Sequence, residues 1–481
     1  MTTIKLDPGA ALLLDALHGA GHAAYAVGGC VRDSLLGLDP HDWDLCTSAR
    51  PEQVMALFGE EKCIPTGLQH GTVTVKQGGR LYETTTFRTE GAYSDGRHPD
   101  AVCFVPDVRE DLARRDFTIN AMAYSAEEGL IDPFDGRDDL AAHLVRAVGE
   151  PERRFEEDAL RILRLYRFAA RFGFAIDPAT GAAARALGPH LDCVSAERIQ
   201  EELLKLLAAP RPGIYLEPAV LAVVLPELEP EKQPERFAEL CRIIDRIEPT
   251  AENVPARLAA LLCPLGEAGA RKALRKLKCS NALTDEVTTL VGGSVGSFLL
   301  GHEFELRHPA DALCLERHSH PAGRCPNSNS LFPPQAAVVA VAGHSIARPI
   351  ACGNRVPPQR TVLGETPGTP NTTLTVQAKR LLGRYELPTI QRLTALCSAR
   401  HPEQAEAFSA LQAEAERLTA ENACCRVSQL AVNGRDLMAA GVRPGPGLRQ
   451  VLNALLEAVI TGQTPNEKDA LLAAAARFSA S

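Results

Sequence analysis

The stretch AYAVGGCVRDSLLGLDPHDWDLC, residues 24–46, decides the fold of the N-terminal part. Its first four residues, Ala24–Val27, are apolar and predict a short buried strand. Gly28-Gly29 then predicts a turn into a helix that begins near Val31. Asp42–Cys46 alternates polar and apolar residues, which is typical of a half-buried strand. Strand, glycine turn, helix and strand in one short stretch indicate an α+β domain.

The pattern continues and then changes along the chain. Residues 72–76 and 80–88 alternate like two further strands, and residues 89–107 are polar and rich in turn formers, which predicts a loop. From Pro151 the periodicity becomes helical. We predict one long amphipathic helix over 153–172 and another over 195–207. The chain is therefore expected to have an α+β head followed by helical domains.

Asp42 and Asp44 are the first candidates for chemistry. Two residues apart on the predicted strand, their carboxylates would share one face. Paired carboxylates suit Mg²⁺, which prefers oxygen ligands and bridges to phosphates, and two such ions can activate a hydroxyl and stabilise a leaving pyrophosphate. The alternative is a solvated Asp-x-Asp turn. Glu83, on a nearby predicted strand, is either a third acid or an ordinary surface carboxylate.

Two neighbouring motifs could bind a nucleotide. Gly28 and Gly29 would let the backbone approach a phosphate, and Arg32 could bind a triphosphate oxygen; a plain strand-to-helix turn also favours glycine. Residues 114–120 (RRDFTIN) carry two cations, an acid and an amide, which are groups that would bind a ribose and its phosphates. A capped helix N-terminus would have a similar composition.

The predicted helix 157–168 carries a polar stripe. Glu157 and Arg161 are four residues apart, and the polar stripe steps by threes from an acid through three arginines: Asp158, Arg161, Arg164 and Arg167. Such a stripe could bind a ligand or could be an ordinary salt-bridged surface.

Together these four elements resemble the nucleotidyltransferases that build the 3′ CCA end of tRNA, in the class that includes bacterial poly(A) polymerases. The resemblance covers about residues 20–210. It includes the loop 89–107, residues 132–140, which are similar to the family's hinge motif, and the helix start 197–199. A weaker similarity covers 433–478. The resemblance implies template-independent addition of C, C and A from CTP and ATP with Mg²⁺.

The resemblance also implies roles for single residues. Asp42 and Asp44 would be catalytic and hold the metals. The nucleotide-binding residues would be Gly28, Gly29, Arg32, Arg115, Asp116, Asn120, Asp158, Arg161, Arg164 and Arg167.

Among these, Asp158 and Arg161 would select the base. Cytosine and adenine present an amine donor beside a ring-nitrogen acceptor, which suits an Asp acceptor and an Arg donor. Uracil and guanine present the reverse, and each buried mismatch costs roughly 1–3 kcal/mol. The loop 89–107 and the hinge 132–140 could reshape the pocket between C and A.

The expected organisation is a catalytic head with a mixed sheet (1–140), then an all-helical neck (141–210), body (211–317) and tRNA-binding tail (377–481), with an insert at 318–376. The alternatives are a poly(A) polymerase, an enzyme that adds only CC or only A, and a catalytically dead RNA-binding protein. The intact acids and arginines count against the last alternative, and the similarity at 433–478 counts against the first.

The insert 318–376 has an unusual composition. It holds nine of the 34 prolines and a single acidic residue, Glu365, which predicts a loosely packed segment; a frame error in the coding sequence would give the same composition. Nearby, Cys314, His318, His320 and Cys325 could ligate zinc, although their spacing fits no zinc pattern and a chance cluster is the better interpretation.

Composition bounds the protein class. With 481 residues, 45% of them hydrophobic and 23% charged, the chain is expected to be a soluble multidomain protein without a signal peptide or membrane span. Fourteen scattered cysteines indicate a reduced, cytoplasmic protein, and oligomeric state stays open. A net charge of −9 argues against a globally basic surface, yet the basic stretch 271–278 could bind RNA phosphates or be a solvated face.

Overall fold

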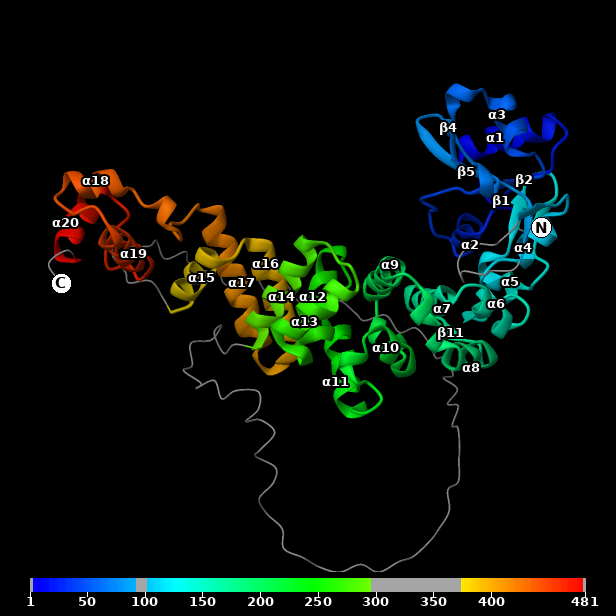
Figure 1. Ribbon diagram of the computed structural model, residues 1–481. Helices are drawn as coiled ribbons and strands as arrows, with labels where there is room; N and C mark the ends of the chain where they lie inside the picture. The colour runs from blue at the N-terminus through cyan, green and yellow to red at the C-terminus, as the bar shows by residue number, and fades with distance from the viewer. Residues whose placement is uncertain (1–2, 92–101, 296–372, 479–481) are drawn as a thin grey trace, which may run out of the picture. The chain divides into compact units, whose positions relative to one another are not determined.

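A computed structural model describes residues 3–91, 102–295 and 373–478 (Figure 1). The chain divides into two compact units. Among the described residues, the larger unit comprises 3–91, 102–295 and 373–429, and the C-terminal unit comprises 430–478. The predicted insert up to residue 372, the possible zinc ligands and residues 92–101 of the predicted loop lie outside the described residues.

The head of the larger unit contains a seven-stranded sheet with the order β3-β4-β5-β2-β1-β8-β9. β2 and β5 run parallel and the other neighbours are antiparallel, so the predicted mixed sheet and α+β class are confirmed. The strands are β1 (Ala24–Val27), β2 (Leu45–Thr47), β3 (Cys63–Gly67), β4 (Thr72–Gln77), β5 (Arg80–Thr86), β8 (Ala123–Ser125) and β9 (Gly129–Ile131).

The two faces of this sheet pack against different helices. On β1, Ala24 and Ala26 join the core that includes the leucines of α1 (Pro8–Gly19). Tyr25 and Val27 join a second cluster with α4 (Val108–Ala113). Alternate side chains of a strand point to opposite faces, so β1 is buried on both. Figure 1 shows α1 and α3 (Pro51–Phe58) beside β4 and β5 at the blue end of the chain.

The predicted loop 89–107 is partly a sheet. β6 (Arg88–Glu90) pairs antiparallel with β7 (Val102–Phe104), which corrects the prediction for both ends of this segment. Pairing satisfies backbone donors and acceptors that an open loop would leave to water. Strands of three residues are too short for alternation in the sequence to predict this pairing.

The predicted single helix 153–172 is wrong, because it is two helices. α6 (Pro151–Glu157) ends at Asp158, whose backbone is extended with φ −148° and ψ 103°, and α7 runs over Leu160–Phe172. The Asp158 carboxylate accepts the Leu160 N–H at 3.1 Å, and its carbonyl accepts the Arg161 N–H at 3.0 Å. Asp side chains compete with helical hydrogen bonds in this way, so Asp158 caps the second helix.

The neck is not all helical as predicted, because β10 (Leu144–Val145) pairs in parallel with β11 (Ala175–Ile176). Helices make up most of the rest of the larger unit. In chain order they are α5 (Gly136–Ala141), α8 (Pro178–Ala186), α9 (Ala196–Leu207), α10 (Pro218–Val224), α11 (Pro234–Arg246), α12 (Val254–Leu262), α13 (Gly266–Lys276), α14 (Asn281–Val295), α15 (Thr373–Arg384), α16 (Leu387–Arg400) and α17 (Ala405–Ala420). In the described ranges, none has the length and apolarity that crossing a bilayer requires.

The C-terminal boundary differs from the expected one. α16 packs against α11, α12 and α14, and α17 packs against α15 and α16. Residues 373–429 therefore complete the body, and the separate unit begins at Leu430 rather than at 377. α15 also begins inside the predicted insert, at Thr373. Apolar packing between helices distant in sequence decides this grouping.

The described part of the C-terminal unit is a three-helix cluster of α18 (Gly434–Ala439), α19 (Pro446–Ile460) and α20 (Lys468–Phe478). Leu437, Leu455 and Leu471 are fully buried in it. The predicted glycine–proline break lies between α18 and α19, as expected. Gly441 has φ 94° and Gly445 has φ 139°, conformations that favour glycine.

Candidate active site

Asp42 and Asp44 share one exposed face of the head. They lie in the extended segment just before β2, not in the strand itself as predicted. The alternate residues Trp43 and Leu45 are 5% and 1% exposed and belong to the core beside α1. Side chains in extended backbone alternate. Both carboxylates therefore point to the opposite side, where they reach solvent.

Glu83 lies next to this pair. In the parallel register of β2 and β5, Leu45 is opposite Thr84, which places Asp44 beside Glu83 on the neighbouring strand. Although Asp44 reaches solvent on one side, partial desolvation raises its pKa to about 6, with repulsion from Glu83 and Asp42 adding to the rise and Arg115 opposing it. The site concentrates negative charge that a bound cation would relieve.

The donor set suits Mg²⁺ more than a metal held by protein ligands alone. Within the described ranges, no three His, Cys, Asp or Glu side chains gather closely enough to hold a metal ion. Mg²⁺ is commonly held by one or two carboxylates, with water and substrate phosphates completing its shell. Asp42 and Asp44 match that requirement.

The glycine turn beside the carboxylates needs glycine at one position. Gly28 precedes α2 (Gly29–Leu35) and has φ 77°, and a Cβ there would lie 2.9 Å from Arg115 Nη1. A Cβ at Gly29 would meet Arg32 at 3.5 Å, an ordinary contact. The Nε of Arg115 is buried and finds no acceptor among the residues described, while its Nη2 donates to Asp111 at 3.3 Å. The Arg115 guanidinium therefore lies beside the glycine turn, and its charge also acts on Asp44.

Arg32 is enclosed by protein groups. It is 4% exposed, donates to Asn120 Oδ1 at 2.5 Å and pairs with Asp33 at 2.7 Å. Its guanidinium lies over the rings of Phe168 and Phe172, at 5.3 and 4.8 Å from their centroids. These contacts leave Arg32 less open to a triphosphate than the sequence pattern predicts, and they join α2 to α7.

A buried polar network continues from Asn120. Its amide donates to Asp116 Oδ1 at 3.0 Å, and Arg164 donates through Nε and Nη2 to Asp116 Oδ2 at 2.9 and 2.7 Å. Burial opposes ionisation of Asp116, but attraction to Arg164 and hydrogen bonds from Asn120 and Arg164 outweigh it and lower the pKa to about 2. Asp116 is thus a buried, ionised carboxylate.

The network ends at Glu202, which sequence reasoning missed. Glu202 lies on α9, is 5% exposed, accepts from Arg167 Nε at 2.5 Å and lies 3.7 Å from Arg164 Nη1. A signal existed: Glu202 shares the apolar face of its helix with Ile199 and Leu203 at helical spacing. An acid on an apolar face predicts a buried cationic partner.

The two predicted base-selecting residues have separate partners. Arg198 donates to both oxygens of Asp158, at 3.2 and 2.8 Å. Arg161 donates through Nη1 to Glu157 at 2.7 Å and to the Arg154 carbonyl at 3.1 Å.

Arg161 keeps part of its donor capacity. Its Nη2 donates once, to the Arg114 carbonyl at 3.2 Å. A guanidinium has five N–H donors, so its Nε and one N–H of Nη2 are free of the contacts found in the described structure.

The predicted hinge packs against the same region. The Asp132 carboxylate accepts the N–H groups of Gly136 and Arg137, at 2.7 and 2.9 Å. A Cβ at Gly136 would lie 2.3 Å from the Thr118 carbonyl oxygen, so only glycine fits. Asp139 accepts from the Thr118 hydroxyl at 2.6 Å. The hinge is thereby fixed to the turn that carries Asn120.

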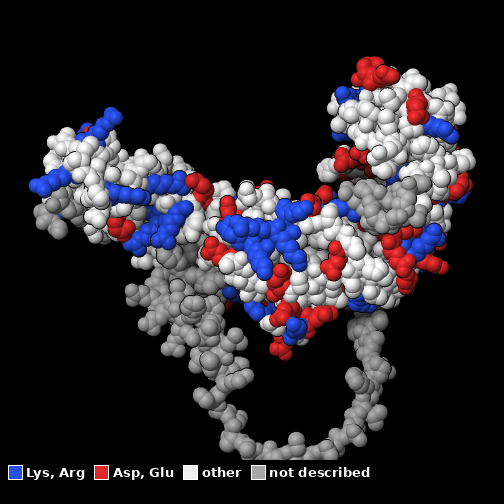
Figure 2. All heavy atoms as spheres, viewed as in Figure 1, with Lys and Arg blue, Asp and Glu red and all other residues white. Residues whose placement is uncertain are grey.

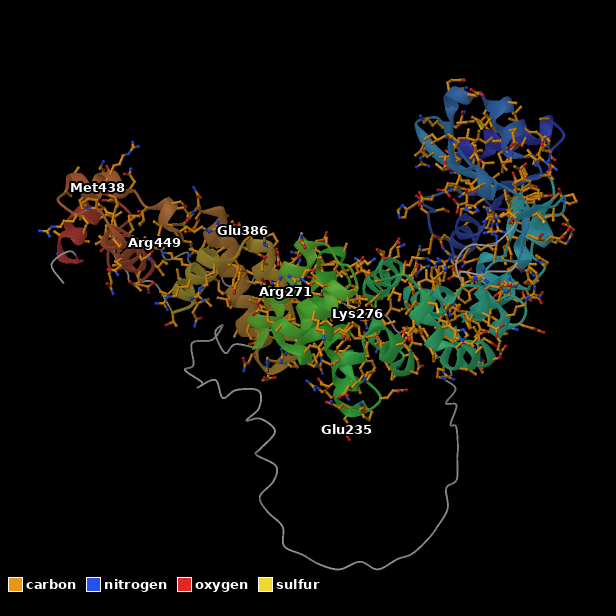
Figure 3. All side chains as sticks on the ribbon, in the orientation of Figure 1. Glu235, Arg271, Lys276, Glu386, Met438 and Arg449 are labelled. Atoms are coloured by element: carbon orange, nitrogen blue, oxygen red, sulfur yellow. The ribbon has the colours of Figure 1, made fainter. Side chains whose placement is uncertain are left out.

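A basic face lies on α13 (Figure 2). Arg271 pairs with Asp285, and Lys278, just beyond the helix, pairs with Glu197, both at 2.7 Å. Lys272, Arg275 and Lys276 are exposed, and no ion pair holds them among the described residues. Arg271 and Lys276 are labelled on this helix in Figure 3. The face offers unpaired cations to a polyanion.

Three family models match the chain. The Poly A polymerase head domain matches residues 24–146, the probable RNA and SrmB-binding site of polymerase A matches 173–231, and the putative tRNA nucleotidyltransferase domain 2 matches 384–475. The first covers the sheet and the carboxylates, the second covers α9, and the third runs from the end of α15 into α20.

Whole proteins are similar as well. A CCA-adding enzyme of Lactobacillus helveticus is 42% identical over 285 residues, 58% of this chain and 69% of that protein. One of Lactiplantibacillus plantarum is 33% identical over 463 residues, 96% and 93% of the two chains. A crystal structure of the Bacillus stearothermophilus CCA-adding enzyme in complex with CTP has a TM-score of 0.68 and 29% identity, over 98% of each chain.

Proposed function

This chain belongs to the family of CCA-adding enzymes, which are tRNA nucleotidyltransferases, and from that premise we propose how its residues divide the reaction. It adds C, C and A to the 3′ end of tRNA from CTP and ATP and releases pyrophosphate. The relative that is similar over nearly its whole length, and the similar structure bound to CTP, support this activity and these substrates.

Asp42 and Asp44 are the proposed metal ligands. The observation that carries this assignment is that both carboxylates lie exposed on one face, opposite buried Trp43 and Leu45. Mg²⁺ held there would activate the 3′ hydroxyl of tRNA and stabilise the leaving pyrophosphate. Glu83 lies close enough to add its charge to the site.

The phosphates and sugar of the incoming nucleotide are assigned to the glycine turn at Gly28 and Gly29 and to residues 114–116 (RRD). Gly28 brings backbone close to the ligand without a side chain, and the guanidinium of Arg115 lies beside it through Nη1. Arg32 acts indirectly on the site. Its side chain donates to Asn120, and Asn120 in turn holds Asp116. Arg32 is therefore proposed to position the site more than to bind phosphate.

Asp158 and Arg161 are the proposed base readers. Oδ1 of Asp158 accepts from Leu160 and Arg198, whereas Oδ2 accepts one hydrogen bond from Arg198 and keeps a lone pair for an amine of cytosine or adenine. The remaining donors of Arg161 suit the ring nitrogen acceptor beside that amine. Uracil and guanine would present a carbonyl and an N–H instead, at a cost of roughly 1–3 kcal/mol per unpaired group.

The other parts are assigned to RNA. We place the catalytic head at 1–140, the neck at 141–210, the body at 211–295 with 373–429, and the tail from 430 onward. Lys272, Arg275 and Lys276 of α13 would contact tRNA phosphates.

The cysteines in the described ranges are free thiols, which supports a cytoplasmic location.

One assay tests the activity. A tRNA that lacks its 3′ end is incubated with each nucleotide alone and with CTP plus ATP, and products are resolved to single nucleotides. We expect two additions with CTP and three with both. Repeated addition from ATP alone would indicate a poly(A) polymerase. A stop after two residues would indicate a CC-only enzyme, and activity only on CC-ended tRNA an A-only enzyme.

A further inference from the structure

Helix α9 directs two charged side chains, one turn apart, at the proposed nucleotide-selecting residues. Arg198 and Glu202 are four positions apart and therefore neighbours on the helix surface. α9 packs against α7 through an apolar face that includes Ile199, Leu203 and Leu206. Because α9 is packed in this way, its two charged groups have fixed places.

Arg198 determines how the Asp158 carboxylate lies. Asp158 sits in the break between α6 and α7, where its backbone is extended and outside the helical hydrogen-bond ladder. Arg198 donates to both of its oxygens, and the Leu160 N–H donates to one. A planar guanidinium that bonds both oxygens fixes the plane of the carboxylate, which a single ammonium cannot do. The free lone pair of Oδ2 thereby has a set direction.

Glu202 acts on the position of Asp116 indirectly, through Arg164. It is 5% exposed, binds Arg167 with one oxygen and lies 3.7 Å from Arg164 with the other. Arg164 has two N–H groups on Asp116. Glu202 therefore restrains the arginine that holds Asp116, the acid of the segment 114–116 that is assigned to the phosphates and sugar.

We propose that Arg198 and Glu202 are positioning residues through which α9 sets both halves of nucleotide selection, the base through Asp158 and the sugar through Arg164 and Asp116. This inference rests on the proposed function of Asp158. The new element is that one helix, α9, holds both Asp158 and Asp116 in place. α9 also lies inside the segment that matches the RNA-binding family model, so the RNA-binding part and the nucleotide pocket share this helix.

The first test is Arg198→Lys, which keeps the charge and removes the bidentate geometry. We expect kcat/KM for CTP to fall and its ratio to that for UTP to drop roughly tenfold, because the Asp158 carboxylate can rotate toward a wrong base. Lys205→Gln is the matched control. Lys205 is on the same helix and pairs with Glu201 at 2.6 Å, with side chains 52% and 65% exposed. An unchanged CTP-to-UTP ratio in Arg198→Lys would overturn the proposal.

A double variant separates positioning from general support of the fold. Asp158→Ala should by itself reduce the CTP-to-UTP ratio, and adding Arg198→Lys should reduce it no further, because the arginine acts through that carboxylate. A further independent loss would mean that Arg198 acts elsewhere and would overturn its role. If Asp158→Ala leaves the ratio unchanged, the base-reading assignment fails, and that result is distinct from a failure of Arg198 alone.

The second test is Glu202→Gln with Glu201→Gln as its control. Glu202→Gln keeps the shape and removes the charge that restrains Arg164. We expect its preference for CTP over dCTP to weaken several-fold with a larger change in KM than in kcat, and no change in Glu201→Gln. If Glu202→Gln does not fold, Arg164→Lys breaks the same link to Asp116. Sugar preference equal to wild type in the folded variant would overturn the role of Glu202.

Discussion

Arg164 donates two hydrogen bonds to one oxygen of Asp116, at 2.9 and 2.7 Å, and this pairing joins the catalytic head to helix α7. On the head side, Asp116 accepts from Asn120, which accepts from Arg32. On the other side, Arg164 lies near Glu202 of α9. One polar chain therefore runs from Arg32 beside the glycine turn, through Asn120, Asp116 and Arg164, to Glu202 on α9.

We expect Asp116→Asn to destabilise the protein in a pH-dependent way. The pKa of Asp116 is lowered from 3.8 to about 2 in the folded state. Because the folded pKa lies below the unfolded value, ionisation stabilises the fold above about pH 4. That contribution, about 2 kcal/mol, is lost as the pH falls toward 2. Urea unfolding near pH 7 and near pH 3 should give a free-energy gap between wild type and variant that narrows in acid.

The control for this prediction is Asp138→Asn, since the Asp138 side chain is 74% exposed and should contribute little at either pH. A gap for Asp116→Asn of the same size at both pH values would show that the altered hydrogen-bond geometry, and not the charge, matters.

Asp42→Ala and Asp44→Ala should each reduce nucleotide addition by on the order of a thousandfold or more while tRNA still binds. The carboxylates hold the metal, whereas RNA affinity comes from cations elsewhere. Primer extension and filter binding measure the two properties separately. Asp39→Ala changes a nearby exposed acid and should be silent. Near-normal turnover in either metal-site variant would exclude the metal assignment.

Changing Lys272, Arg275 and Lys276 together to Gln should weaken tRNA binding. It should also make that binding less dependent on salt concentration. The slope of log K against log salt should become shallower by about 0.7–0.9 for each phosphate that the variant no longer neutralises. Binding at several salt concentrations measures this slope. Lys232→Gln removes a cation whose side chain is 75% exposed, on another part of the body, and should leave the slope unchanged. An unaltered slope in the triple variant would mean that α13 is only a solvated face.

Local sequence signals predict the head well. The apolar run Ala24–Val27, the glycine turn and the alternation at Asp42–Cys46 depend on neighbours in sequence, and β1, Gly28 and the shared face of the two acids agree with them. Gly28 is required by its φ of 77°, whereas the approach of Arg115, which lies far along the chain, could not be predicted. Periodicity contains no information on such contacts.

The remaining differences between prediction and structure arise from particular side-chain contacts, local or distant, that periodicity does not reveal. The helical pattern of 153–172 gives no sign of the break, because the break depends on the Asp158 side chain capping the second helix. Burial of Arg32 depends on Phe168 and Phe172, which come from that second helix. The sequence places the tail boundary at 377 because α16 is helical like the tail, and only its packing against α12 and α14 assigns it to the body.

Deletion of residues 318–372 with a short linker should leave a folded, active enzyme. The deletion stops before α15, since that helix begins at Thr373 and buries Ala378 and Leu381. The segment has few periodic apolar residues, and a loop's closure entropy changes slowly with its length. Thermal unfolding and tRNA extension measure the outcome. A longer deletion through 384 should unfold the body; insolubility of the shorter deletion would show that the segment packs.

Arg161→Ala should lose discrimination as well as rate. The arginine offers its free N–H donors to N3 of cytosine or N1 of adenine, and the same donors oppose the ring N–H of uracil and guanine. Without them, correct addition falls and the penalty against UTP and GTP shrinks, by roughly tenfold for one mismatched buried group. The partners of Arg161 are Glu157 and two carbonyl groups, so the metal site should be unaffected. Comparing kcat/KM for the four nucleotides measures the change. Arg185→Ala, whose side chain is 52% exposed on α8, is the control. An equal drop for all four nucleotides would mean that Arg161 supports the fold, and base selection would then have to be sought in other residues of α7, first in Arg164.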